Sequence, residues 1–230
     1  GDPVRGSKRM PREERWAQIL DVAAAIFYEK GYDATSLQDI ADGVGILKGS
    51  IYYYIEAKGD LLFQVLLDAH EAGLKNIRTV AKGTGDPIER LSKMIRIHTD
   101  YVCREPAKAA IYMHERRRLT AEQRQQFLGS EHSYIDLFEE VIMEGQERNL
   151  LTKNFEPKLA ALCLLASLNA VHLWFRRNGN FSSEMIGDYF VTANLTGLMT
   201  AKGDVALAEA VSPAKPQRSN VTTSPRRVRD

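Results

Sequence analysis

The sequence predicts an all-α protein that has a small N-terminal three-helix unit and a larger helical body. Apolar residues recur with the spacing i, i+3, i+4, i+7 from about residue 11 to about residue 201, which is the period of an amphipathic helix. No alternating apolar and polar segment is bounded by turn residues, so no strand is expected. Breakers such as KGTGDP at 82–87 separate the periodic segments.

The composition is that of a globular protein of 230 residues, of which 44% are hydrophobic and 27% are charged. This length can bury a sizeable core in one or two domains, and the ordinary apolar fraction excludes a disordered chain. No apolar run approaches the length of about 18 residues that spans a bilayer, so no membrane partner is expected. Because Cys103 and Cys163 cannot form a disulfide scaffold and the N-terminus lacks the apolar region of a signal peptide, we expect a cytoplasmic protein.

Charge is unevenly distributed, although the net charge is only +1. Residues 1–12 carry four basic residues against one acidic, and residues 202–230 carry six against three, so residues 13–201 sum to −5. We predict a basic flexible arm at 1–10 and a disordered basic tail at 202–230. Basic tails commonly serve solubility, but beside a DNA-docking element the arm could enter a minor groove.

The N-terminal unit, residues 11–57, is expected to contain three helices. The first begins after Pro11 and ends before Gly31, in agreement with the preferences of these residues for helix starts and helix ends. Ser36 opens the second helix with an S-x-x-D capping box. The third helix is short, at about 47–55.

The body, residues 58–201, is expected to contain six further helices. Proline residues or the Asn-Gly-Asn turn mark several of their boundaries. The expected ranges are about 58–80, 87–104, 106–118, 121–149 with a candidate break at Gly129, 156–178 and 183–201.

The second and third helices are joined by a glycine-containing turn and form a helix-turn-helix. Gly45 lets the chain reverse without a Cβ penalty, and small residues near the start of the third helix allow close approach to base edges in a major groove. Three consecutive tyrosines cannot all face one core, because adjacent residues point around a helix. We expect Tyr52 and Tyr53 to point outward and Tyr54 to pack against a neighbouring helix.

The stretch GYDATSLQDIADGVGILKGSIYYYIEAKGDLL resembles the DNA-binding signature of the TetR family of transcriptional repressors, over about residues 12–67. The resemblance implies an all-α homodimer whose first three helices bind DNA and whose remaining helices hold a small ligand and the dimer interface. Leu47 departs from the pattern, since many members carry a capping Ser or Thr there. The residues that the resemblance assigns to DNA binding are Thr35, Ser36, Leu47, Lys48, Gly49, Ser50, Tyr52, Tyr53 and Lys58.

Candidate effector-binding residues are polar, aromatic or flexible side chains within otherwise apolar stripes of the body. They are Tyr101, Tyr112, Met113, Arg116, Tyr134, Phe138, Asn169, His172 and Trp174. The three arginines at 116–118 are either solvated or paired with carboxylates, or they clamp the phosphates of a nucleotide-bearing ligand. The five histidines show no i, i+3 or i+4 pairing, so neither a metal site nor a cofactor is expected.

The body also resembles TetR regulators of lipid and steroid catabolism that respond to acyl-coenzyme A thioesters, in IYMHERRRLTAEQRQQF and in the Trp174-Phe175-Arg176 cluster. This resemblance implies an acyl-coenzyme A thioester, or a related lipid or steroid metabolite, as the effector that releases the repressor from its operator. Two alternatives remain, a regulator of efflux that responds to lipophilic drugs and a DNA-binding protein without a ligand. An enzyme is not expected, because the sequence has no phosphate-binding loop and no nucleophile elbow.

The last two long helices are apolar over wide faces. Such faces are buried either in the core of one chain or in a subunit interface. Pairing them with their symmetry mates would give an isologous homodimer. Two recognition helices would then read a palindromic operator whose half-sites lie about 34–36 Å apart.

Overall fold

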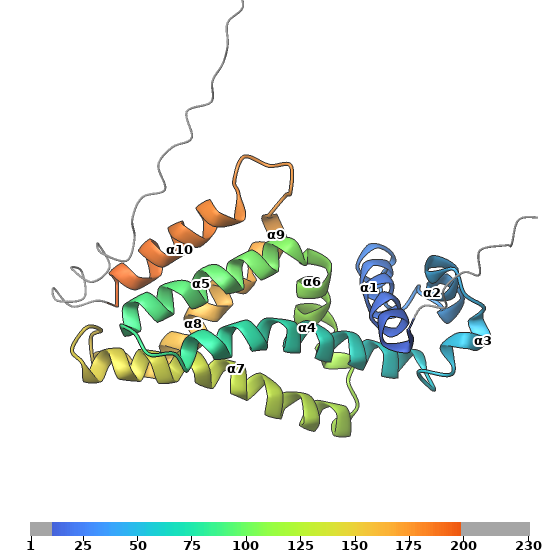
Figure 1. The fold of residues 1–230 in the computed structure, drawn as a ribbon, viewed down its shortest axis with the longest axis horizontal. Coiled ribbons are helices and arrows are strands. Elements are labelled where there is room, and N and C mark those ends of the chain that lie inside the picture. Colours follow the sequence, from blue (N-terminus) through green and yellow to red (C-terminus); the bar gives the residue numbers. More distant parts are fainter. Residues whose placement is uncertain (1–10, 199–230) are drawn as a thin grey trace, which may run out of the picture.

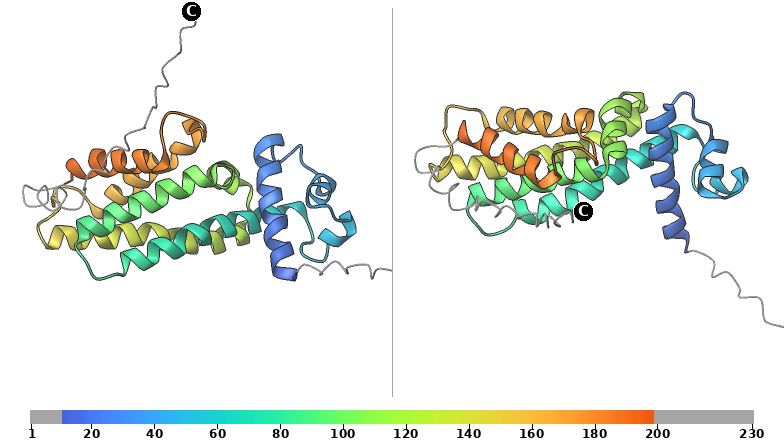
Figure 2. Two further views of the ribbon diagram at one scale, coloured as in Figure 1. Left: turned by 45° about the horizontal axis from the view of Figure 1, so that its top comes forward. Right: turned by 90° about the horizontal axis from the view of Figure 1, so that it is seen from above.

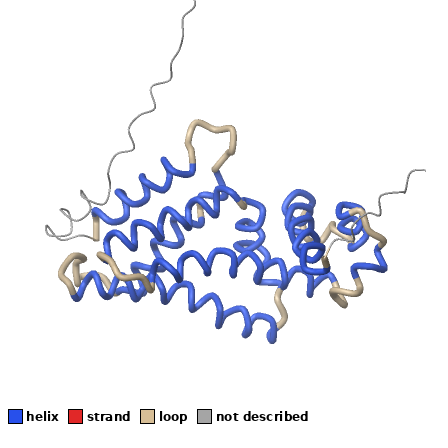
Figure 3. Tube along the Cα trace, viewed as in Figure 1, coloured by secondary structure: helices blue, strands red, loops and turns tan. Residues whose placement is uncertain are grey.

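The computed structural model describes residues 11–198, apart from the side chains of residues 128–133. Within that range every regular element is a helix, in agreement with the sequence prediction, and Figure 3 shows no strand there. The predicted basic arm at 1–10, the end of the last expected helix at 199–201 and the predicted basic tail at 202–230 lie outside the described residues.

The N-terminal unit consists of α1 (Arg12–Lys30), α2 (Leu37–Val44) and α3 (Lys48–Ile51). Its apolar faces meet in one core, in which Phe27 and Ile51 are fully buried. The unit lies at one end of the elongated molecule (Figure 1).

Helix α4 (Lys58–Ala81) runs from this unit into the body (Figure 1). Its first half belongs to the core of the N-terminal unit through Leu61 and Leu66, whereas Leu74 and Ile77 in its second half belong to the core of the body. One continuous helix therefore connects the two cores.

The body is a helical bundle that includes the second half of α4 (Figure 2). Its further helices are α5 (Pro87–Arg104), α6 (Pro106–Glu115), α7 (Ala121–Glu147), α8 (Pro157–Asn169), α9 (Val171–Trp174) and α10 (Ser183–Thr196). Within the bundle α5 packs against α4, α7, α8 and α10. Helix α6 is the element of the body that lies against both α1 and α4. This position matters for the site described below.

The expected third helix at 47–55 is too long. Helix α3 ends at Ile51, and the following residues form turns in which the Tyr54 N–H donates to the Ile51 carbonyl at 2.9 Å. The shortening has a long-range cause, because Tyr54 packs its ring against Trp16 of α1 with the two centroids 5.3 Å apart.

The expected helix at 156–178 is also wrong in length, since it breaks at Ala170 into α8 and α9. The Asn169 carbonyl is taken by the Nδ1 of His172 at 2.5 Å, and the Leu173 N–H bonds to the Ala170 carbonyl instead. A side chain that occupies a backbone acceptor shifts the helix into a tighter turn here.

The other boundaries differ by smaller amounts. The expected helix at 106–118 ends at Glu115 and continues as one 3₁₀ turn, η1 (Arg116–Arg118). Helix α7 is continuous through Gly129, so the candidate break there is wrong.

Candidate DNA-binding and effector sites

The turn between α2 and α3 has the geometry that the sequence predicts. Ser36 and Asp39 form the reciprocal capping box of α2, with the Asp39 N–H donating to Ser36 Oγ at 3.1 Å. Hydrogen bonds from Lys30 and Ser36 hold the pKa of the Asp39 carboxyl well below its usual range. Gly45 ends α2 with φ of +74°, a left-handed conformation that favours glycine.

The surface of α3 and the following turn is exposed and carries most of the predicted DNA contacts. Leu47 and Tyr53 are 81% and 82% exposed, and Tyr52 is 51% exposed. Lys48 and Gly49 are exposed beside them, and nothing lies within 4 Å of the position that a Cβ on Gly49 would take. The outward positions of the two tyrosines confirm the sequence expectation, and the arrangement leaves a small-residue edge that can approach bases.

Tyr54 is part of a stack that ties the start of α1 to the end of the recognition segment. Its ring lies parallel to that of Trp16, with an interplanar angle of 4°, and the Arg12 guanidinium carbon lies 5.7 Å from the Tyr54 centroid. The expectation that Tyr54 packs against a neighbouring helix is confirmed. The stack fixes the direction in which α3 presents its exposed residues.

Thr35 and Lys58, which the resemblance assigns to DNA binding, have internal partners instead. Thr35 is 2% exposed and its hydroxyl donates to the Gly31 carbonyl at 2.8 Å. The Lys58 ammonium donates to the carbonyls of Tyr32 and Thr35, each at 2.8 Å, and of Asp33 at 3.4 Å. In the structure these donors bind the α1–α2 connection next to the cap of α2, and a phosphate contact by either residue stays a prediction.

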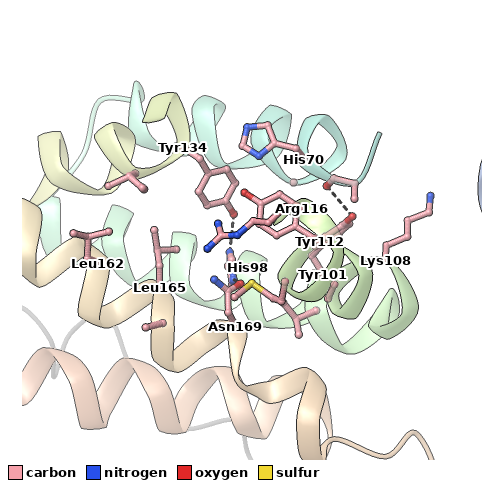
Figure 4. A pocket seen from close by; sticks show the side chains of 17 residues that line it. His70, His98, Tyr101, Lys108, Tyr112, Arg116, Tyr134, Leu162, Leu165 and Asn169 are labelled. Carbon is pink, nitrogen blue, oxygen red and sulfur yellow. Dashed lines mark hydrogen bonds between the residues drawn. The ribbon is translucent and has the colours of Figure 1, made fainter. Parts of the chain in front are cut away.

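A cavity of about 230 Å³ lies in the body between α4, α5, α6, α7 and α8 (Figure 4). Six of the nine sequence-predicted effector residues line it, namely Tyr101, Tyr112, Met113, Arg116, Tyr134 and Asn169. Leu162, Leu165 and Ile135 form its apolar part. The structure thus brings together, from four α-helices and the 3₁₀ turn η1, residues that are up to 68 positions apart in sequence.

The structure places the other three predicted effector residues outside this cavity. Phe138 is fully buried in the body core, where its ring stacks on Tyr134. His172, in α9 after the break at Ala170, lines a separate crevice between α1, α6 and α9. Trp174 is 47% exposed and lines neither.

Three titratable residues of the cavity, His70, His98 and Lys108, are not among the predicted effector residues. The sequence contains a signal for two of them, because His98 lies three residues before Tyr101 and Lys108 lies four residues before Tyr112, on the same helix faces. His98 was not predicted to line the cavity, because this histidine was considered only as a candidate metal ligand. Among the described residues, no group of three or more potential ligands is placed to hold a metal ion.

The polar centre of the cavity is a hydrogen-bonded chain across three helices. His98 Nδ1 lies 2.7 Å from the Tyr134 hydroxyl, and His98 Nε2 lies 3.0 Å from Asn169 Oδ1 (Figure 4). Since the amide oxygen only accepts, Nε2 carries the proton and Nδ1 accepts from the Tyr134 hydroxyl. Burial lowers the pKa of His98 to about 4, so the imidazole is neutral near neutral pH.

The neutral state of His98 predicts a pH-dependent stability. Between its folded pKa of about 4 and its ordinary value of 6.5, the unfolded chain binds a proton that the folded chain does not, so stability falls as the pH falls. Between pH 7.5 and pH 5 the wild type is expected to lose about 2 kcal/mol more than His98→Gln. Urea unfolding of both proteins at the two pH values measures this difference, and equal losses would contradict a neutral buried His98.

Two ion-paired clusters join the body to the N-terminal unit. The Lys108 ammonium on α6 lies 2.7 Å from Asp21 of α1 and 2.7 Å from Asp68 of α4. Burial alone would lower the pKa of Lys108, but the hydrogen bonds with these carboxylates outweigh it and raise the pKa. Arg118 of η1 makes a bidentate pair with Asp33 in the α1–α2 connection, with contacts of 2.9 and 2.7 Å.

Large apolar side chains are exposed on the last three helices. On α8 and α9 these are Leu159, Leu162, Leu173 and Trp174, and on α10 they are Met185 and Tyr189. The segment Pro157–Trp174 is also long and apolar enough to cross a membrane by composition alone, which is weak evidence because core and interface helices pass the same test. These side chains lie on the helices that the sequence analysis assigns to the dimer interface, and that assignment stays a prediction.

Fold and sites together define a DNA-binding transcriptional regulator, with a helix-turn-helix at one end and an effector cavity in a helical body. Family comparisons agree with this class. Residues 19–65 match the model of bacterial regulatory proteins of the tetR family, and residues 84–198 match the tetracyclin repressor-like C-terminal domain. The chain belongs to the TetR family, whose members act as dimers.

Individual relatives extend over most of the chain. The HTH-type transcriptional repressor KstR2 of Mycobacterium tuberculosis is 26% identical over 189 residues, which cover 80% of this chain and 92% of that protein. AibR, solved in complex with isovaleryl coenzyme A and operator DNA, is 27% identical with a TM-score of 0.71, covering 78% of this chain and 97% of AibR. The solved KstR2 structure, 23% identical with a TM-score of 0.74, covers 83% of this chain and 97% of that one and supports the fold.

Proposed function

We propose that this protein is a dimeric repressor that a small acyl thioester releases from its operator. One observation carries the proposal: α6 lines the cavity with one face and packs against α1 with another. Tyr112 and Met113 line the cavity, whereas Ile111 is buried in the same core as the helices of the DNA-binding unit. A ligand that displaces α6 would therefore displace α1 and the recognition segment.

The Lys108 cluster supports this route. Lys108 is one of the residues that line the cavity, and its ammonium pairs with Asp21 of α1 (Figure 4 shows the side chain extending away from the cavity centre). Movement of α6 would therefore stretch an ion pair that reaches the DNA-binding unit directly.

The size and lining of the cavity support a short acyl group as the part of the effector that is enclosed. A volume of about 230 Å³ is smaller than most drug-sized pockets, which have about 300–1,000 Å³, so the coenzyme would lie outside it. Arg116 lines the cavity and is exposed, so it is placed where a charged head group would emerge. AibR, which was solved with isovaleryl coenzyme A, provides the precedent among similar proteins.

We infer further that the protein acts in the cytoplasm, where its operator is found, and that it has no catalytic role. The second inference is supported by the comparisons, in which the similar proteins are transcriptional regulators.

Gel-shift titration with DNA from upstream of its own gene tests operator binding. Lys48→Ala and Tyr53→Phe are each expected to weaken binding about tenfold, because each removes a phosphate or base contact from both subunits. Lys153→Ala, at an exposed lysine in the connection between α7 and α8, is the matched control. Unchanged affinity in both α3-region variants would contradict the assignment of the recognition segment.

The protein–operator complex formed in the gel shift is also used to test the effector. Isovaleryl- or hexanoyl-coenzyme A is expected to dissociate it at micromolar concentration, whereas free coenzyme A is not. Release by lipophilic drugs but not by the thioesters would favour a regulator of efflux instead.

A further inference from the structure

The buried hydrogen-bonded chain of the cavity fixes the orientation of one amide group. Asn169 Oδ1 accepts from His98 Nε2 at 3.0 Å, and this contact decides which way the amide plane faces. The Nδ2 donors of Asn169 then face away from His98, on a residue that lines the cavity. The chain continues to Tyr134, whose hydroxyl donates to His98 Nδ1, so all three side chains hold one another in place.

The charge state of this part of the cavity selects an uncharged partner. His98 is neutral, and burial raises the pKa of both Tyr101 and Tyr134, so the two phenols stay protonated. The Lys108 ammonium is bound by two carboxylates. Arg116 is the other cationic residue that lines the cavity, so an ionised carboxylate would be attracted to its guanidinium rather than to the neutral amide of Asn169. A carbonyl oxygen needs only the hydrogen bond.

The apolar part of the cavity lies next to this amide. Leu162 and Leu165 stand on the same helix as Asn169, two turns and one turn before it respectively, and both line the cavity. An acyl chain that occupies this part would hold its carbonyl close to Asn169. The sulfur and the coenzyme would then continue toward Arg116, which is exposed.

We propose that Asn169, held by His98 and Tyr134, binds the carbonyl oxygen of the effector through Nδ2–H, so that the site distinguishes an acyl thioester from its free acid and from a thioether of the same length. This inference rests on the proposed acyl thioester effector and adds the group by which that effector is recognised.

Calorimetric titration of the full-length protein with three probes tests the inference. The probes are hexanoyl-coenzyme A, S-hexyl-coenzyme A, which lacks only the carbonyl oxygen, and hexanoate. Hexanoyl-coenzyme A is expected to bind about tenfold more tightly than S-hexyl-coenzyme A, as one buried hydrogen bond would give, and hexanoate is expected to bind more weakly than both. Equal affinities of the wild type for thioester and thioether would overturn the inference without any variant.

Asn169→Leu is the decisive variant, since leucine keeps a similar volume and removes the donor. It is expected to bind the thioester and the thioether equally. Ser167→Ala is the matched control on α8, because Ser167 donates its hydroxyl to the Leu164 carbonyl and does not line the cavity, so the tenfold preference should remain. A preference that persists in Asn169→Leu would overturn the role of Asn169.

Operator binding is measured separately and keeps the two proposals apart. If hexanoyl-coenzyme A binds with the carbonyl preference but leaves the operator complex intact, the release mechanism is wrong and the recognition of the carbonyl stands. If neither coenzyme A derivative binds a protein that still retards its operator, the carbonyl recognition and the thioester effector are both wrong, whereas DNA binding is unaffected.

Discussion

Leu159→Arg is expected to convert the dimer to monomers and to lower operator affinity at least about 100-fold. Leu159 is 57% exposed on α8 and is one of the large apolar side chains exposed on α8, α9 and α10. In an isologous interface each substitution occurs twice, so two guanidinium groups would be buried against apolar surface without a counter-charge. A monomer binds one half-site without the effective concentration that its partner supplies, which accounts for the expected loss.

Cys163 provides a direct readout of the same interface. It is exposed and lies one helical turn after Leu159, on the same side of α8. Cys103 is buried, and burial raises its pKa to about 11, so it should react slowly with thiol reagents. Reaction with a disulfide reagent is therefore expected to be slow in the wild-type dimer and fast in Leu159→Arg.

Met143→Arg is the matched control for this prediction. Met143 is 43% exposed on α7, which is not one of the three helices whose exposed apolar side chains form the expected interface. The Met143→Arg variant should remain dimeric in sedimentation and keep the operator affinity of the wild type. A wild-type-like Leu159→Arg protein, with a protected Cys163, would contradict this assignment of the dimer interface.

The fold was largely predictable because its determinants are local. The period of apolar residues, the Ser36 capping box and the breakers at 82–87 are each local signals. The structure has helices where the first two predict them and a turn between α4 and α5 at the breakers. Helix ends that depend on distant contacts were not predictable in the same way. Tyr54 leaves the helical path to pack on Trp16, which lies 38 positions earlier in the sequence.

The effector site, too, combines features that local sequence predicts with contacts that depend on packing between distant segments. Residues such as Tyr101 and Tyr112 could be predicted, because a polar aromatic side chain on an apolar helix face is visible in the sequence. The hydrogen-bonded chain from Tyr134 through His98 to Asn169 could not be predicted, since it requires the relative placement of α5, α7 and α8. Sequence spacing gives the face of a helix, and only packing gives the partner across from it.

Lys58→Met is expected to destabilise the protein by at least about 2 kcal/mol, although a family pattern alone would assign this lysine to DNA. Its ammonium holds three backbone carbonyls of the α1–α2 connection and lies 4.3 Å from the Tyr32 ring centroid. Hydrogen bonds to a charged group contribute about 1.5–3 kcal/mol, and methionine leaves these carbonyls without that donor. Lys30→Met is the matched control, because Lys30 pairs with Asp39 in an exposed ion pair that contributes at most about 1 kcal/mol.

The salt dependence of operator binding separates an internal role of Lys58 from a phosphate contact. A lysine that neutralises a phosphate contributes to counterion release, so its removal lowers the slope of log K against log salt by about one per contact. Lys58→Met is expected to weaken operator binding with the slope unchanged, because the substitution loosens the connection that positions Ser36 and the start of α2. Lys48→Ala, at an exposed lysine on α3, is expected to lower the slope. A reduced slope of log K against log salt with unchanged stability in Lys58→Met would contradict the internal role. It would show that Lys58 contacts DNA and that its ammonium turns outward when the operator binds.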